Sequence, residues 1–143
     1  MHRNQDGFTL VELLVVILII GILTAIAVPA FLGQRARSHD AAAKTVVRNA
    51  ATAMETWWID NRTYVGGTAV ALQNIDPSLR PANGITLSMP SLPTATGYVI
   101  RVTSKSTNTW TITRTATGVN TGRFTRTCAR GTSKGSCSTR LTW

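Results

Sequence analysis

Residues 7–34 have the sequence GFTLVELLVVILIIGILTAIAVPAFLGQ, and from Leu13 to Gln34 they contain no charged residue. A membrane-spanning helix needs about 20 mostly apolar residues, so this segment is long enough to be one. We expect a single helix from Phe8 onward. Pro29 lies inside that helix, and because proline removes a backbone hydrogen bond, it predicts a kink near Ala25–Pro29.

Two simple interpretations of this segment leave Glu12 unexplained. A secretory signal peptide has a basic start, a short apolar stretch and a cleavage site with small residues. Here the apolar stretch is long, and Ala25-Ile26-Ala27 is a weak cleavage signal. A plain membrane anchor gives no reason for a carboxylate so close to the start of the apolar run.

The stretch Gly7-Phe8-Thr9-Leu10-Val11-Glu12-Leu13-Leu14 resembles the class III signal sequence of type IV prepilins and pseudopilins. In that family a short leader ends in glycine, phenylalanine follows, glutamate is the fifth residue after the cut, and an apolar helix comes next. All of these features match this sequence. The resemblance is close from Gly7 to about Pro29. It implies that a prepilin peptidase cuts between Gly7 and Phe8 and methylates the new amine on Phe8.

The resemblance also implies a role for Glu12. A carboxylate at membrane depth is costly unless a cation meets it. In the family, the equivalent glutamate meets the N-terminal amine of a neighbouring subunit, here that of Phe8, and this pairing would set the register of helices stacked in a filament core. The alternative is that Glu12 lies at the membrane interface and reaches water.

Gly21 and Pro29 resemble a glycine and a proline that, in related pilins, flank a stretch which loses helicity in the filament. The resemblance therefore implies local melting between these residues on assembly. The alternative is structural, because glycine and proline are both commoner in membrane helices than in soluble ones.

The charges around the apolar run give a conflicting topology signal. Basic residues follow it at Arg35, Arg37, Lys44 and Arg48. Only Arg3 and the starting amine precede it, and Asp6 leaves the leader without net formal charge. The positive-inside rule alone would place the C-terminal part in the cytoplasm. The prepilin motif implies a cytoplasmic leader and the cysteine pair an oxidising exterior, so we expect the opposite orientation.

Beyond the membrane segment the helix is expected to continue to about Asp60, since Asp60-Asn61 and Gly66-Gly67 mark its end. Apolar residues recur at helical spacing at Ala36, Ala43, Val47, Ala50, Met54 and Trp57. Charged residues fall mostly on other faces, which predicts a narrow apolar stripe. The predicted segments are a leader at 1–7, an apolar helix at 8–32, its amphipathic continuation at 33–62 and a globular region at 63–143.

The globular region begins with a segment that is predicted to be mainly loop. Residues 63–96 contain Pro77, Pro81, Pro90 and Pro93 together with several glycines. A short strand is expected at Ile85–Met89.

Strands are predicted after this loop. Apolar and polar residues alternate from Tyr98 to Thr103 and again from Trp110 to Thr113, with a turn at Ser106–Asn108. A third strand is expected at Gly122–Cys128. Period-two patterning joined by short turns is typical of an antiparallel meander.

The predicted fold class is therefore α+β and pilin-like. A long N-terminal helix would pack on a small C-terminal antiparallel sheet. Trp57, Tyr98 and Trp110 are expected in the core between them.

Cys128 and Cys137 are the two cysteines of the chain. A disulfide between them suits a compartment outside the cytoplasm, and closing so short a loop should contribute about 2–3 kcal/mol. No cluster of histidines or further cysteines accompanies them, so no metal site is expected.

Nothing in the sequence favours an enzyme. The histidines are His2 and His39, and the predicted cut removes His2. Glu55 and Asp60 do not share a helix face, so they do not form a paired general acid and base. There is no phosphate-binding glycine loop, and no cofactor is expected.

The charge is unevenly placed. The 143 residues carry a formal net charge of +9, and no acidic residue follows Asp76. Nine basic residues do follow it, at Arg80, Arg101, Lys105, Arg114, Arg123, Arg126, Arg130, Lys134 and Arg140. Such a surface attracts polyanions such as nucleic acid, anionic cell-wall polymers or lipid head groups.

Three functions are compatible with these features. The favoured one is a structural subunit of an extracellular type IV pilus, held in the membrane by one helix before assembly into a filament on the bacterial cell surface. The resemblance implies, as partners, other copies of the chain, minor pilins, a prepilin peptidase, an inner-membrane assembly platform and an ATPase motor. A pseudopilin of a type II secretion system is the second, although many of these have acidic calcium-binding loops that this C-terminal part lacks.

The third function is a DNA-binding pilin that serves in DNA uptake. Arg123, Arg126 and Arg130 are the candidates for contact with a polyanion, and Trp110, Phe124 and Trp143 could stack on bases. The alternative is that the basic residues solvate a sheet surface or meet the cell envelope.

Overall fold

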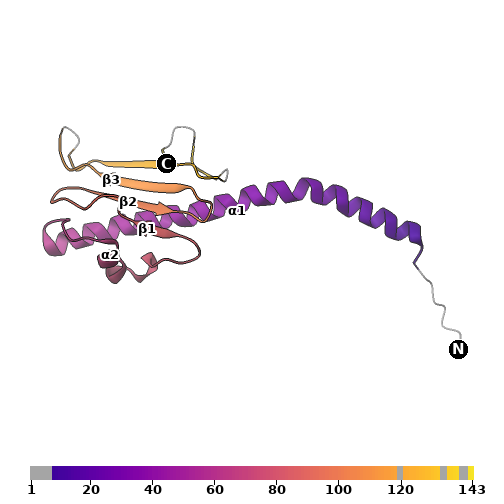
Figure 1. Cartoon of the computed structure of the whole chain (residues 1–143), viewed down its shortest axis with the longest axis horizontal. Coiled ribbons are helices and arrows are strands. Elements are labelled where there is room, and N and C mark those ends of the chain that lie inside the picture. Colours follow the sequence, from indigo (N-terminus) through magenta and orange to yellow (C-terminus); the bar gives the residue numbers. More distant parts are fainter. Residues whose placement is uncertain (1–7, 119–120, 133–134, 139–141) are drawn as a thin grey trace, which may run out of the picture. The chain divides into compact units, whose positions relative to one another are not determined.

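The structure is a computed structural model that describes residues 8–118, 121–132, 135–138 and 142–143 (Figure 1). The chain forms two compact units, Met1–Gln34 and Arg35–Trp143. Helix α1 spans Leu10–Asn61 and contributes to both units.

The N-terminal unit consists of the first half of α1. The helix is long and apolar enough to cross a membrane, and it is the one such helix within the described part of the chain. It stays helical through Gly21 and Pro29. Thr24 bonds back to the helix, donating its hydroxyl to the Ile20 carbonyl at 2.8 Å, so a polar side chain is satisfied inside the apolar run.

The C-terminal unit contains a four-stranded antiparallel sheet in the order β1-β2-β3-β4. Its strands are β1 (Thr86–Ser88), β2 (Tyr98–Thr103), β3 (Thr109–Arg114) and β4 (Phe124–Ala129). Neighbouring strands follow each other in sequence, as in the predicted meander. Figure 1 shows the second half of α1 running along the sheet.

The core lies between this half of α1 and the sheet. Ala43, Val47, Ala50 and Met54 are fully buried on the helix. From the sheet, Ile100, Val102 and Trp110 are also fully buried, and Tyr98 is nearly so. The predicted apolar stripe is confirmed because alternate strand residues meet it. Trp57, however, is only partly buried at the edge of this cluster.

The region predicted as mainly loop contains helical structure that was not expected from the sequence. Helix α2 spans Ala69–Ile75, and a 3₁₀ helix follows at Pro77–Leu79. The Thr68 hydroxyl accepts the Ala71 N–H at 3.2 Å as the cap of α2. The nearby prolines favoured a loop over these helical turns, although Pro77 stands at the start of one, where proline is tolerated.

The C-terminal segment is tied to β4. A disulfide joins Cys128 of β4 to Cys137, as expected from the sequence, with 5.8 Å between their Cα atoms. The indole N–H of Trp143 donates to the Thr127 carbonyl at 2.9 Å. The rings of Trp143 and Trp110 meet edge to face with centroids 5.6 Å apart, so the end of the chain covers part of the core.

Candidate functional site

The start of α1 is a capping box. The Thr9 hydroxyl accepts the Glu12 N–H at 3.2 Å, and a Glu12 carboxylate oxygen accepts the Thr9 N–H at 3.0 Å. The same oxygen accepts the Thr9 hydroxyl proton at 2.9 Å. This reciprocal arrangement satisfies two backbone donors that a helix start leaves open.

The capping box gives Glu12 a position that was not predicted from the sequence. The carboxylate is turned back toward the beginning of its own helix, where it accepts the N–H of Thr9, the residue after Phe8. Thr9-Leu10-Val11-Glu12 fits the T-x-x-E pattern that marks such a cap, so the signal was present in the sequence. Gly7, the residue before the predicted cut, lies outside the described residues.

The apolar side chains that follow Glu12 are all exposed in the isolated chain. Between Leu10 and Leu32, the exposed fraction of the large apolar side chains ranges from 44% at Val15 to 79% at Leu10. An uncovered apolar surface of this length is unfavourable in water. The segment therefore requires either a bilayer or other protein surfaces around it.

The N-terminal segment and much of the rest of the chain match known proteins. Residues 2–28 match the family model described as a prokaryotic N-terminal methylation motif. The fimbrial protein EcpC of Eikenella corrodens is 34% identical over 107 residues, which cover 75% of this chain and 67% of that protein. This chain belongs to the type IV pilin family. The match includes both Phe8 and Glu12.

Other relatives of this pilin cover less of its length. The type IV wide pilus major component PilA4 of Thermus thermophilus is 40% identical over 62% of this chain and 66% of that protein. The type II secretion system core protein G of Pseudomonas aeruginosa is 37% identical over 44% of each chain. The pilin thus spans less than two thirds of most of these relatives. No solved structure shows significant similarity to it.

The three arginines predicted to contact a polyanion are exposed on or beside β4, but they do not line one site. Arg130 donates from Nε to the Cys137 carbonyl at 3.2 Å, so it supports the disulfide-closed loop. Arg126 instead lines a cavity beside α1, which neither Arg123 nor Arg130 borders.

The aromatic residues proposed for base stacking also separate. Trp110 is fully buried, so the prediction that it could stack on a base is wrong. Its alternating position in β3 directs it into the core. Phe124 is 44% exposed, and Trp143 is partly exposed. Of the three, these two remain able to meet a ligand from solvent.

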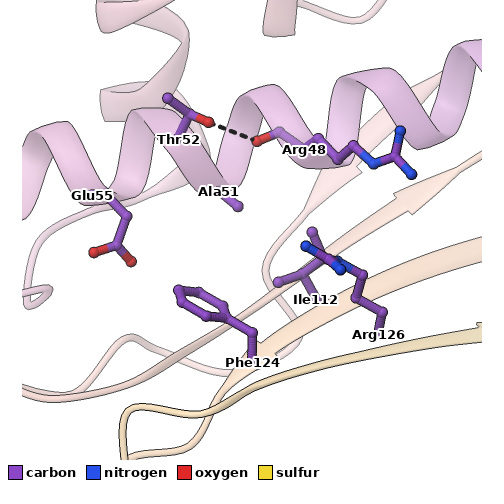
Figure 2. Close-up of a pocket in the computed structure, with 7 residues that line it drawn as sticks. All are labelled: Arg48, Ala51, Thr52, Glu55, Ile112, Phe124 and Arg126. Atoms are coloured by element: carbon purple, nitrogen blue, oxygen red, sulfur yellow. Dashed lines mark hydrogen bonds between the residues drawn. The ribbon is translucent and has the colours of Figure 1, made fainter. Parts of the chain in front are cut away.

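The cavity beside Arg126 lies between the second half of α1 and strands β3 and β4 (Figure 2). Its volume is about 320 Å³. It is lined by Arg48, Ala51, Thr52, Glu55, Ile112, Phe124 and Arg126. We refer to these residues as the basic pocket. Arg48 was not among the residues predicted to contact a polyanion, because it is far from β4 in sequence and its charge bears first on the membrane topology.

Glu55 forms the centre of a polar cluster at one end of the basic pocket. It accepts the hydroxyl protons of Tyr64 at 2.9 Å and Tyr98 at 3.0 Å. Arg114 Nη1 lies 3.2 Å from one of its oxygens. Burial, together with the hydrogen bond and negative charge of Glu55, raises the pKa of Tyr64 to about 12.

The same causes act on Tyr98. Its burial, followed by the charge of Glu55, raises the pKa of the Tyr98 hydroxyl well above its usual value. Both phenols therefore stay protonated and continue to donate to Glu55 at neutral pH.

A second polar cluster surrounds Asp40, which is fully buried on α1. Its carboxylate accepts the Ser106 hydroxyl, the Asn108 amide at 2.9 Å and the Ser136 N–H at 2.7 Å. Burial raises the pKa of Asp40, but these hydrogen bonds outweigh it and hold the pKa below its usual value. Asp40 was not singled out in the sequence, because its partners are distant in the chain.

Gly135 explains how the backbone reaches this buried acid. A Cβ atom on Gly135 would lie 1.8 Å from an Asp40 carboxylate oxygen. Only glycine therefore allows the approach. The cluster joins α1 to the turn between β2 and β3 and to the loop that the disulfide closes, so its role is structural.

The clusters offer no ligand set for a metal ion. Within the described part of the chain, no group of three or more His, Cys, Asp or Glu residues lies close enough to hold one. The relatives named above are a fimbrial protein, a pilus component and a secretion-system core protein rather than enzymes.

Proposed function

We propose that this pilin is a structural subunit of a type IV pilus, cleaved after Gly7 by a prepilin peptidase and N-methylated on Phe8. One observation supports this most strongly. The exposed apolar stretch from Leu10 to Leu32 holds a single acidic residue, Glu12, and this residue lies within the segment 2–28 that matches the methylation motif. We further propose that the chain has no catalytic activity of its own.

Assembly follows from the need to cover this helix. In the precursor a bilayer covers it, and in the filament the helices of neighbouring copies do so. A contact that repeats head to tail without closing on itself produces an open helical filament. The pilin would thus be a single-pass membrane protein first and part of an extracellular filament afterwards.

Glu12 would set the register of that filament. Cleavage frees a cationic amine on Phe8, and the amine of one copy would meet the Glu12 carboxylate of another. The capping box supports this role because it holds the carboxylate at the first turn of α1. If neighbouring helices shifted along each other, this charge pair would separate and leave two unpaired charges among apolar side chains. That cost favours one register.

The remaining assignments are proposals of the same kind. Residues 1–7 are the leader, 8–32 the filament-core helix, 33–62 its amphipathic continuation and 63–143 the globular region. The stretch between Gly21 and Pro29 would lose helicity on assembly. Partners would include prepilin peptidase, minor pilins, an inner-membrane platform and an ATPase motor.

A pseudopilin of a type II secretion system is the second candidate. The similarity to core protein G of Pseudomonas aeruginosa favours it. The absence of acidic residues after Asp76 counts against the acidic calcium-binding loop that many such proteins have. The two candidates differ in where the processed chain accumulates.

Mass spectrometry on filaments sheared from the native cell surface tests the proposal. The expected result is an abundant peptide that begins at Phe8 and carries one added methyl group. Processed protein that stays with the cell would favour the pseudopilin. An intact N-terminus at Met1 in mature protein would overturn both.

Glu12→Gln separates processing from assembly. This variant should be processed at Phe8 but absent from the sheared fraction, since it lacks the charge that meets the amine. Asp60→Asn is the matched control, because Asp60 is an exposed acid on the same helix, and it should assemble normally. Normal assembly of Glu12→Gln would remove the register role.

A further inference from the structure

The basic pocket contains two cationic side chains that lack an acidic partner. Among the described residues, neither Arg48 nor Arg126 forms an ion pair, and the single salt bridge joins Arg114 to Glu55. Both arginines are exposed. Like charges placed on one cavity repel each other, so this arrangement favours an anion that binds between them.

Glu55 also lines the pocket but does not neutralise these arginines. Its two oxygens already accept hydrogen bonds from Tyr64, Tyr98 and Arg114. With Arg114 balancing its charge, the Glu55 end of the pocket is close to neutral. The net positive charge therefore remains with Arg48 and Arg126.

Both arginines lie against the ring of Trp143. The guanidinium carbon of Arg48 lies 5.1 Å from the ring centroid, and that of Arg126 lies 6.0 Å from it. Such cation–π contacts restrain flexible side chains at exposed sites. Restrained guanidiniums lose less freedom when they bind an oxyanion, and their planar fork suits phosphate.

The rest of the pocket is lined by Thr52 and by the apolar side chains of Ala51, Ile112 and Phe124. The guanidinium carbon of Arg114 lies 5.3 Å from the Phe124 ring centroid, but Phe124 remains 44% exposed and so still offers aromatic surface to a ligand. Figure 2 shows Arg126 reaching toward Ile112, with Phe124 beside it and Arg48 projecting from α1. The volume of about 320 Å³ is small, at the lower end of ligand pockets, and suits one planar group.

We propose that the basic pocket binds one nucleotide unit of single-stranded DNA, with backbone phosphates at Arg48 and Arg126 and the base stacked on Phe124. This inference goes beyond the proposed role in a filament. An unpaired base exposes the flat face that Phe124 would stack against, whereas duplex DNA keeps its bases stacked within the helix. Lipid head groups and acidic peptides provide the anion but not a base.

Fluorescence anisotropy with a labelled oligothymidylate tests the proposal on the full chain in dodecylmaltoside micelles. Arg48→Gln and Arg126→Gln should each weaken binding by about tenfold, as expected for loss of a charge-assisted hydrogen bond. The salt dependence should become shallower by about 0.7 in logarithmic slope for each lost contact. Phe124→Leu should weaken binding by about fivefold or more through lost stacking.

Arg101→Gln is the matched control. Arg101 is exposed on β2, where Ile100 and Val102 on either side of it face the core, so it lies on the other face of the sheet. Its loss removes one charge without touching the pocket and should change affinity by less than about twofold. Arg126→Lys keeps the charge but not the planar fork, and should retain only part of the affinity.

Three results would overturn the proposal. One is equal weakening by Arg101→Gln and Arg126→Gln, which indicates diffuse attraction. Another is equal affinity for an abasic deoxyribose-phosphate oligomer, which indicates that no base is bound. The third is tighter binding of duplex DNA or of anionic vesicles. Tryptophan fluorescence melting of each variant checks that it remains folded, and filament assembly is not needed for any of these measurements.

Discussion

Arg114, the last residue of β3, contacts Glu55 of helix α1 with both carboxylate oxygens in reach, at 3.2 and 3.3 Å from Nη1. Glu55 also accepts hydrogen bonds from the hydroxyl groups of Tyr64, just beyond the helix, and Tyr98, the first residue of β2. One carboxylate therefore connects three parts of the globular unit. Its partners give this acid a structural role in the fold.

Glu55→Ala should lower the free energy of unfolding by about 2–3 kcal/mol, because two phenols and a guanidinium lose their shared acceptor. Tryptophan fluorescence during denaturant unfolding measures it. All four tryptophans, Trp57, Trp58, Trp110 and Trp143, lie in the unit Arg35–Trp143 and report on it alone.

The control for this variant is Asp60→Ala, which removes an exposed acid from the same helix. It should change the free energy of unfolding by less than about 0.5 kcal/mol. Similar losses for the two variants would mean that the Glu55 cluster is not a specific support.

The two tyrosines predict a loss of stability in alkali. A tyrosine titrates near pH 10 in the unfolded chain, whereas the pKa of Tyr64 is raised to about 12 in the fold. The raised pKa adds to the free energy of unfolding. This contribution is complete below pH ~10 and is lost as the pH rises toward 12. Unfolding measured at successive pH values should show this decline.

Tyr64→Phe provides the control for the alkaline decline. It removes one of the two titrating groups, so stability should fall less steeply above pH ~10. Since the chain has two tyrosines, tyrosinate absorbance reports only on Tyr64 and Tyr98. Absorbance that rises near pH 10 in the folded protein would contradict the raised pKa values.

Local patterns were sufficient to predict most of this fold. The apolar run, the helical spacing of Val47 and Met54, and the alternation in β2 and β3 each depend on residues close in sequence. Trp57 was predicted in the core but is only partly buried. Helical spacing predicts on which face of the helix a residue lies, but not how far along that face the sheet extends. Helix α2 was missed because prolines nearby outweighed its cap at Thr68.

The sites were less predictable because they assemble from distant residues. The motif around Phe8 and Glu12 is continuous and therefore visible in sequence. In contrast, Arg48 and Arg126 line one pocket only because the second half of α1 lies beside the sheet. Asp40 gains its partners only when the turn between β2 and β3 and the C-terminal loop both fold onto α1. No spacing rule connects such positions before the topology is known.

Asp40→Asn should destabilise the globular unit by about 2 kcal/mol, because three donors then face an amide that donates as well. The size of this loss of stability should depend on pH. The hydrogen bonds hold the pKa of Asp40 below its usual value, so its contribution is present above pH ~4 and is lost as the pH falls through the folded pKa.

The difference in stability between wild type and Asp40→Asn should therefore shrink as the pH falls below about 4. Asp60→Asn, which alters an exposed acid of the same helix, should leave the free energy of unfolding at neutral pH almost unchanged. If the difference in stability stays constant to low pH, the negative charge of Asp40 does not contribute to the stability of the fold.

The disulfide and Asp40 should act together. Ser136, which donates to Asp40, is adjacent to Cys137, so the bond from Cys128 also positions this donor. Cys128→Ser with Cys137→Ser should cost about 2–3 kcal/mol by itself. Because the loop that supplies Ser136 is then released, adding Asp40→Asn should cost less than it does in the oxidised protein. A double-mutant cycle with an interaction energy above about 0.5 kcal/mol would establish the coupling, and simple additivity would show that the loop holds its place without the sulfur bridge.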